Sequence, residues 1–154
     1  MKKYFIIILI VFIYGEAYSQ SYKDISVKSH RDFSFGNILP GITTSVATTA
    51  QTAGRYLINM SHNMTVSLTF NLPVNLSSGG NNLHIDYIAT KSTTSNDGTL
   101  GTSFDPYTGT TIQRTDEHTS DWYIRIGGSI PTLSTQASGD YTGTIILTMT
   151  IIGG

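Results

Sequence analysis

The sequence contains no cysteine. A chain without thiols forms no disulfide bond and holds neither a thiolate metal site nor a cysteine nucleophile. Charged residues make up only 12% of the chain, and acidic and basic residues nearly balance. Nucleic-acid partners are therefore not expected, because they require a concentrated basic patch. Packing and sheet hydrogen bonds alone must hold the fold.

Long apolar runs are also scarce. The one clear example, residues 4–14, follows a basic start and precedes the small residues Ala17 and Ser19. This order is typical of a signal peptide. The competing interpretation is a membrane anchor, but the run is shorter than the roughly 18–20 residues that span a bilayer. We expect a signal peptide over 1–19 and a single domain over 20–154. The mature protein would then be exported to the periplasm, the cell surface or the medium, without membrane insertion after signal cleavage.

Helix-forming patterns are absent from the rest of the chain. Thr, Ser, Gly, Asn, Ile and Tyr dominate, and these residues favour strands and turns. Apolar residues recur with a period of two and never with a sustained period of 3.6. The pattern predicts an all-β protein, an antiparallel Ig-like or fimbrial-adhesin-like β-sandwich of about 7–9 strands. A closed barrel is the alternative.

The alternation places the strands along the chain. We expect the polar stretch 90–109 to be the longest loop, with part of a hairpin inside it. The expected strands cover residues 24–29, 32–35, 44–49, 55–60, 64–70, 83–89, 110–114, 121–126 and 142–152.

The last of these strands is the longest and the most apolar. Ile145, Leu147, Met149 and Ile151 share one face, and no charged residue follows Asp140. Such a strand at an exposed edge would invite aggregation. We therefore expect it to be the central strand of the sandwich, buried between the sheets and paired on both sides, with the segment 24–35 along one of them.

No arrangement of residues points to catalysis. His30, His62, His84 and His118 form no zinc-ligand spacing. The acidic cluster "TDEHTSD" at 115–121 would be the one cue for a hydrolase, and we interpret it as a solvated loop. "SNDG" at 95–98 lacks the further oxygen ligands of a calcium loop and is interpreted as a turn. The chain is expected not to be an enzyme and to have no catalytic, cofactor or metal site.

Two motifs lie near opposite ends of the expected domain. They are "RDFSFGNILPG", residues 31–41, and "GDYTGTIILTMTI", residues 139–151. Together they resemble a bacterial family of exported proteins, domain of unknown function 4402, which is similar to fimbrial and spore-coat-U-type β-sandwiches. The resemblance covers most of the expected domain. The structural motif residues that it singles out are Phe33, Phe35, Gly36, Pro40, Gly41, Tyr141, Gly143, Ile145, Leu147 and Met149.

The first motif has a direct physical interpretation. Phe33 and Phe35 lie two residues apart, so an extended chain would point both rings into the core. Gly36 permits a bend there. Pro40 followed by Gly41 predicts a type II turn, in which proline fixes one φ and glycine takes a positive φ. Tyr141, in the second motif, is expected to pack under a corner of the sandwich.

The resemblance implies an exported structural or adhesive cell-surface protein, fimbrial-subunit-like and non-catalytic. Its partners would be other surface-protein subunits, joined by strand addition. The alternative is a carbohydrate- or ligand-binding secreted module, for which exposed aromatic side chains would be needed. The candidates are Tyr107, Trp122 and Tyr123.

Overall fold

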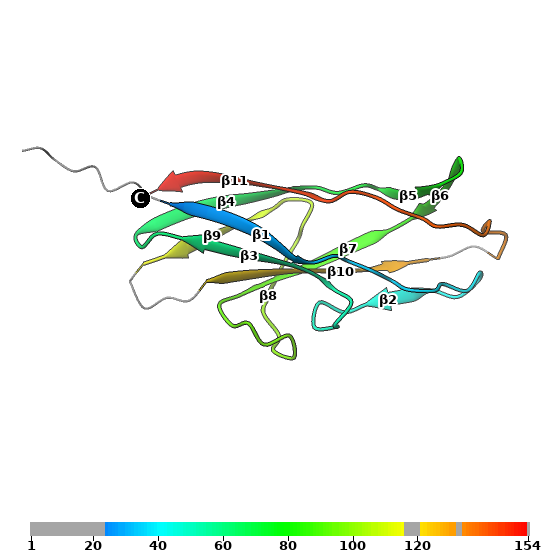
Figure 1. The fold of residues 1–154 in the computed structure, drawn as a ribbon, viewed down its shortest axis with the longest axis horizontal. Helices are drawn as coiled ribbons and strands as arrows, with labels where there is room; N and C mark the ends of the chain where they lie inside the picture. Colours follow the sequence, from blue (N-terminus) through cyan, green and yellow to red (C-terminus); the bar gives the residue numbers. More distant parts are fainter. Residues whose placement is uncertain (1–23, 116–120, 132–133, 154) are drawn as a thin grey trace, which may run out of the picture.

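The computed structural model describes residues 24–115, 121–131 and 134–153, so the predicted signal peptide lies outside the described residues. Within these ranges the protein is all-β, and no helix is long and apolar enough to cross a membrane. Figure 1 shows the strands running along one long axis. They are β1 (Ile25–Arg31), β2 (Thr44–Val46), β3 (Gly54–Met60), β4 (Met64–Asn71), β5 (Asn75–Ser78), β6 (Asn81–His84), β7 (Asp86–Ser92), β8 (Thr102–Phe104), β9 (Thr110–Arg114), β10 (Trp122–Ile130) and β11 (Ile146–Gly153).

The strands form two facing sheets and a hairpin. The large sheet has the order β1-β3-β10-β7-β8, with β2 paired to β10, and the small sheet has the order β11-β4-β9. β5 and β6 form a separate two-stranded hairpin. All pairs are antiparallel, which agrees with the predicted antiparallel sandwich.

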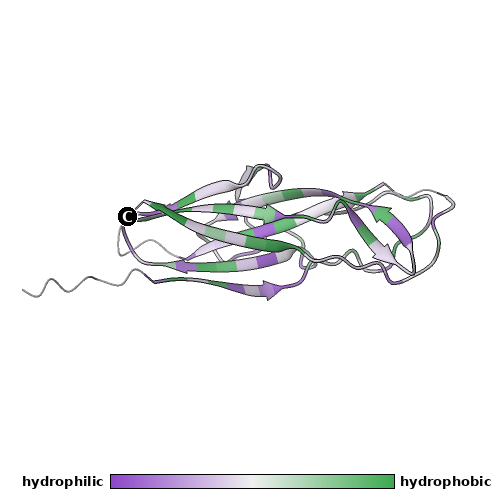
Figure 2. Ribbon diagram, turned by 90° about the horizontal axis from the view of Figure 1, so that it is seen from above, coloured by the Kyte–Doolittle hydropathy of each residue, from purple (hydrophilic) through white to green (hydrophobic). Residues whose placement is uncertain are grey.

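The core lies between the two sheets and follows from the alternation. Successive side chains in a strand point to opposite faces, so every second residue faces the core, and these residues are the apolar ones. In β4, Met64, Val66 and Leu68 are fully buried while the residues between them are not. Figure 2 shows these alternating bands of hydrophobic and hydrophilic residues along the strands. The buried cluster comprises Ile58, Met60, Met64, Val66, Leu68, Leu83, Ile85, Tyr87, Ala89, Ile112, Ile124, Ile126 and Ile130.

β10 is the most enclosed strand of the large sheet. It pairs with β7 along one edge and, along the other, first with β3 and then with β2. Gly127 stands where the partner changes, and a Cβ built there would collide with the carbonyl oxygen of Val46. The glycine allows the two backbones to approach at this junction.

Several expected strands formed close to their predicted limits, among them β3, β4 and β9. The stretch 83–89 is divided between β6 and β7, because the backbone N–H of Ile85 donates instead to Val74. The segment 32–35 was predicted as a strand and is not one. β5 was missed, and β8 occupies part of the predicted long loop. The total of eleven strands in the described residues exceeds the predicted 7–9.

The prediction for the last strand was wrong in its main point. β11 is an edge strand of the small sheet, paired only with β4, and the segment 24–35 does not pair with it. β1 pairs instead with β3 in the large sheet. Leu147 and Met149 face the core but are only partly buried, and Ile151 is 48% exposed. The apolar alternation identified the inward face of the strand correctly but could not identify its neighbours.

Candidate functional site: the open side of the sandwich

β11 is an edge strand of the small sheet, and its free edge is exposed in the described structure. One edge of the strand is paired with β4 from Asn71 to Thr65, and no described residue donates or accepts a backbone hydrogen bond along the other edge. An edge of this kind presents a row of N–H and C=O groups to which another strand can add.

The side chains of β11 include none of the charged residues or prolines that oppose such pairing. The strand contains no charged residue and no proline between Ile146 and Gly153. Ile146 is 52% exposed and Ile152 is 57% exposed, both on the face directed away from the core. Natural proteins usually protect free edges with lysine, proline or a bulge at exposed positions. Here the one register irregularity lies at the very end, between Ile151 and Gly153.

β1 and β11 border the same side of the sandwich. β9, the opposite edge of the small sheet, is held over the middle of the large sheet: the indole N–H of Trp122 donates to the carbonyl of Gln113 at 3.1 Å, and Lys91 Nζ donates to the carbonyl of Thr111 at 2.6 Å. Because β4 separates β9 from β11, β11 lies toward the β1 edge. β1 is the edge strand of the large sheet on this side.

The core is incompletely covered where these two edges face each other. Val27 pairs with Ile58 and Ile151 pairs with Val66, so both side chains lie on core faces. Val27 is nevertheless 42% exposed and Ile151 is 48% exposed. The two residues lie at the same end of the sandwich, because a short turn joins β3 to β4 there. We call this region, bounded by β1 and β11, the open side.

The residues of the first predicted motif lie elsewhere, in an irregular segment after β1. The rings of Phe33 and Phe35 are 4.8 Å apart and pack, partly buried, against the core. Gly36 has a φ of 65°. At Pro40 the chain makes a turn in which the N–H of Ile42 donates to Leu39 at 3.3 Å, and Gly41 has a φ of 79°, as in a type II turn.

The second motif leads into the open side. The hydroxyl of Tyr141 donates to the carbonyl of Ala137 at 2.8 Å and accepts from Gln136 at 2.7 Å, while the ring packs against the core. A Cβ at Gly143 would lie 2.8 Å from Leu76 of the hairpin, so the chain passes close to β5 there. Ile145 precedes β11 and, with Leu147 and Met149, packs partly buried against the core.

The polar candidates do not converge. Most of the 115–121 cluster, including His118, lies outside the described residues; Asp121 accepts a hydrogen bond from Asn59 at 2.6 Å. His30, His62 and His84 are all exposed. Among the described residues no group of three or more His, Asp or Glu side chains is arranged to hold a metal ion.

"SNDG" forms a turn, as the sequence predicted. The side chain of Asn96 accepts from Gly98 N–H at 3.0 Å, which directs the neighbouring Asp97 onto the outer face of the large sheet. There Asp97 accepts from Arg31 at 2.9 Å, from Arg55 at 3.3 Å and from Arg125 at 3.4 Å. The hydrogen bond from Arg31 is the main reason why the pKa of Asp97 lies below its usual value, and partial burial of the carboxyl opposes it.

The candidate aromatic residues form no common platform. Trp122 and Tyr123 point to opposite faces of β10, and Tyr123 lies beneath the guanidinium of Arg55, 4.7 Å from the ring centroid. Tyr107 is 55% exposed but its hydroxyl accepts from the N–H of Tyr87. Burial raises the pKa of Tyr87 to about 12.

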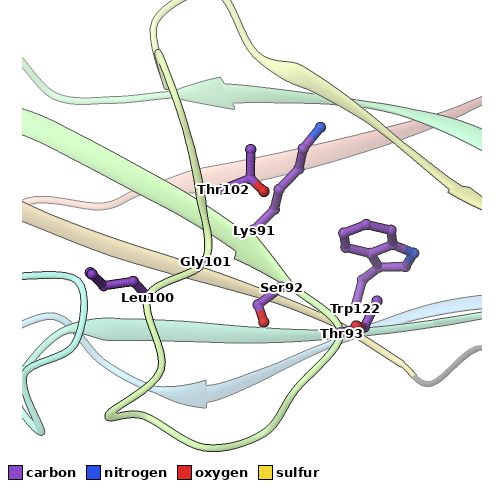
Figure 3. A pocket seen from close by; sticks show the side chains of 7 residues that line it. All are labelled: Lys91, Ser92, Thr93, Leu100, Gly101, Thr102 and Trp122. Carbon is purple, nitrogen blue, oxygen red and sulfur yellow. The ribbon is translucent and has the colours of Figure 1, made fainter.

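Trp122 does border an open pocket of about 300 Å³ (Figure 3). The indole N–H and Lys91 Nζ are both engaged by β9, so neither donor is free to turn into the pocket without breaking a hydrogen bond. The lining residues are Lys91, Ser92, Thr93, Leu100, Gly101, Thr102 and Trp122.

Comparisons with models of protein families, with curated proteins and with solved structures found no match for this chain. The open side therefore has to be interpreted from its own residues. Sequence reasoning missed it, although one signal was available. Ile146 and Ile152 interrupt the polar face of the last strand, and such residues occur either at a covered strand or at an edge that receives a partner.

Proposed function

We propose that this chain is a non-catalytic subunit of an exported surface structure, fimbrial-subunit-like, that joins its neighbours by strand addition at β11. The observation that carries the proposal is the free edge of β11, which is uncharged and exposes Ile146 and Ile152. In strand addition, main-chain hydrogen bonds supply affinity, and side chains at alternate positions supply specificity.

The open side adds a second reason. A strand that pairs with β11 would place every second side chain between the two sheets, where Val27 and Ile151 are half exposed. Covering apolar surface contributes about 25 cal/mol per Å². The added strand would therefore complete the core as well as the small sheet.

Export and family membership belong to the same proposal. They rest on the signal-peptide pattern of residues 1–19 and on the resemblance of the motifs at 31–41 and 139–151 to the exported family named above. A surface subunit without a catalytic centre is consistent with the dispersed polar residues of the described structure.

Self-association of the chain beginning at residue 20 tests the proposal. We expect sedimentation velocity to show concentration-dependent oligomers, and the double variant Ile146→Lys/Ile152→Lys to remain monomeric. Two lysines on an edge strand oppose the addition of a further strand. Both side chains are exposed, so the melting temperature should change little.

Ile88→Lys is the matched control. Ile88 is 50% exposed, but it lies on β7, which is paired on both sides. The control should associate like the unmodified chain. A monomeric unmodified chain at every soluble concentration would contradict assembly through this edge, and so would equal effects of the edge and control variants.

A saccharide-binding module is the second candidate, and the pocket beside Trp122 is the observation that favours it. Titration with neutral and acidic oligosaccharides should then quench the fluorescence of this tryptophan, the only one in the chain. Absence of quenching would remove this candidate and leave the assembly proposal untouched.

A further inference from the structure

A row of arginines crosses the outer face of the large sheet, well away from the open side. Arg31 of β1 pairs with Arg55 of β3, and Arg55 pairs with Arg125 of β10. On the other side of Arg125, the paired residue of β7 is Thr90. We call these four residues the arginine row. Cross-strand neighbours in a sheet have Cβ atoms about 4.5–5.5 Å apart, so three like charges are held close together.

The loop 93–101, between β7 and β8, covers this row. Arg125 Nη2 donates to the carbonyl oxygens of Thr94 and Asn96 at 2.9 Å and 2.8 Å. Asp97 is the single carboxylate that the described structure places in contact with any of the three guanidinium groups. The contacts therefore combine three positive charges with one negative charge.

Burial makes this imbalance costly. The side chain of Arg125 is 0% exposed, that of Arg55 is 14% exposed and that of Arg31 is 26% exposed. Buried charges lose their hydration, and one shared carboxylate with a few carbonyl groups compensates three guanidinium groups only in part. Arg31 is relieved by water and by the carbonyls of Ala53 and Ala50, whereas Arg125 has no access to solvent.

The same place holds unpartnered hydrogen-bonding groups. Three buried side-chain atoms in the described part of the chain have no partner, and all three belong to the arginine row: Arg55 Nε, Arg125 Nη1 and Thr90 Oγ1. Two are N–H donors and the third is a hydroxyl that can donate. Native proteins leave few such groups, and a bound water or ion is one of the explanations for them.

We propose that the arginine row binds a small monovalent anion of halide size beneath the 93–101 loop, between Arg125 Nη1 and Thr90 Oγ1. Both the charge and the hydrogen-bonding groups favour an anion. A water molecule could accept these hydrogen bonds but would leave the positive charge uncompensated. Because the side chain of Arg125 has no access to solvent, the anion can enter only while the 93–101 loop is displaced from the sheet, either during folding or in a transient opening.

Thermal unfolding at constant ionic strength tests the proposal. Sodium chloride and sodium bromide should raise the melting temperature by roughly 3–6 °C over sodium methanesulfonate, as expected for a ligand at about ten times its Kd. Methanesulfonate is too large for a halide-sized site. General screening of the arginine charges depends on ionic strength, which is held equal, and so produces no such difference.

Two variants locate the effect. Thr90→Val keeps the shape of the side chain and removes the hydroxyl, so it should reduce the chloride-dependent shift by about half or more. Asp97→Asn removes the internal carboxylate and should enlarge that shift. A halide effect that neither variant alters would overturn the placement at this row.

A bromide-containing crystal gives the direct observation. We expect an anomalous peak within hydrogen-bonding distance of Arg125 Nη1. Equal melting temperatures in chloride and methanesulfonate would overturn the proposal. Solvent density at this position without anomalous signal would also overturn it, because a water molecule would then be the occupant.

Discussion

Asp97 shows how one carboxylate can link segments that are distant in the sequence. It joins the 93–101 loop to β1, β3 and β10 through three guanidinium groups. The residue types alone gave no sign of this role, because the arginines become neighbours only through the register of two strand pairs, β1 with β3 and β3 with β10. Sequence reasoning identified the turn at 95–98 but not the contact that the turn positions.

The depressed pKa of Asp97 predicts an acid-sensitive contribution to stability. Protons bind this carboxylate more tightly in the unfolded chain, so its contribution is present above the unfolded pKa, near 4, and is lost as the pH falls through the lower folded pKa. We expect Asp97→Asn to melt at a lower temperature than the unmodified protein at neutral pH, and the two melting curves to converge near the acid limit. Calorimetry across this pH range checks the prediction, and a constant difference at all pH values would contradict it.

Among the elements, β4 and β11 form a natural pair for comparing burial. Leu68 on β4 is fully buried, whereas Leu147 on β11 faces the same core but is only partly covered. Leu68→Ala should therefore lower the free energy of unfolding by about 2–5 kcal/mol. Leu147→Ala should cost about 1 kcal/mol, because less apolar area is lost. Urea titration of the two variants measures both values.

The ordering of these two costs is the critical result. If Leu147→Ala destabilised the protein as much as Leu68→Ala, β11 would be covered on its free side in solution, by another part of the chain or by a second copy. A comparison above and below the concentration at which oligomers form would separate these two cases.

At the scale of elements, the sequence predicted where strands lie along the chain better than it predicted which strands pair with each other. Period-two alternation located β3, β4 and β9 because each of these strands buries one face. It failed for 32–35, where the two phenylalanines pack inward but the backbone joins no sheet. The backbone hydrogen bond found in this segment runs from the N–H of Ser34 to the carbonyl of Thr52 at 3.0 Å. It failed for β5, a polar hairpin strand of four residues with no apolar alternation to reveal it.

For the whole molecule, removal of residues 20–29 predicts a folded but more associative protein. The part of β1 that would be removed contributes little to the core, since Ile25 is only partly buried and the next five residues are exposed. Its loss would uncover the edge of β3 beside the open side. We expect light scattering after size exclusion to show larger oligomers than the intact chain forms, with a β-type circular dichroism spectrum retained. A truncated chain that is unfolded would show instead that β1 is essential to the large sheet.

The order of the strands within each sheet could not be predicted from the sequence, and the reason is physical. A strand's alternation records which of its faces packs on the core, but backbone hydrogen bonds join strands within the plane of the sheet, so the side-chain pattern does not show whether one edge or both are paired. β11 has this ambiguous pattern, and its place at the edge became clear only when the pairing with β4 alone was known. The all-β class and the antiparallel sandwich depended on no such choice and could be predicted.

The pairing of β4 with β11 also sets the order of events during synthesis. β4 is made early, yet its partner along one edge is made only after the chain has passed through β5 to β10. Throughout that interval Val66 and Leu68 lack their final cover, and apolar surface exposed in this way draws nascent chains into aggregates unless a chaperone shields it. The small sheet can therefore close only after β11 has been made, so β4 waits for this partner through the synthesis of six intervening strands.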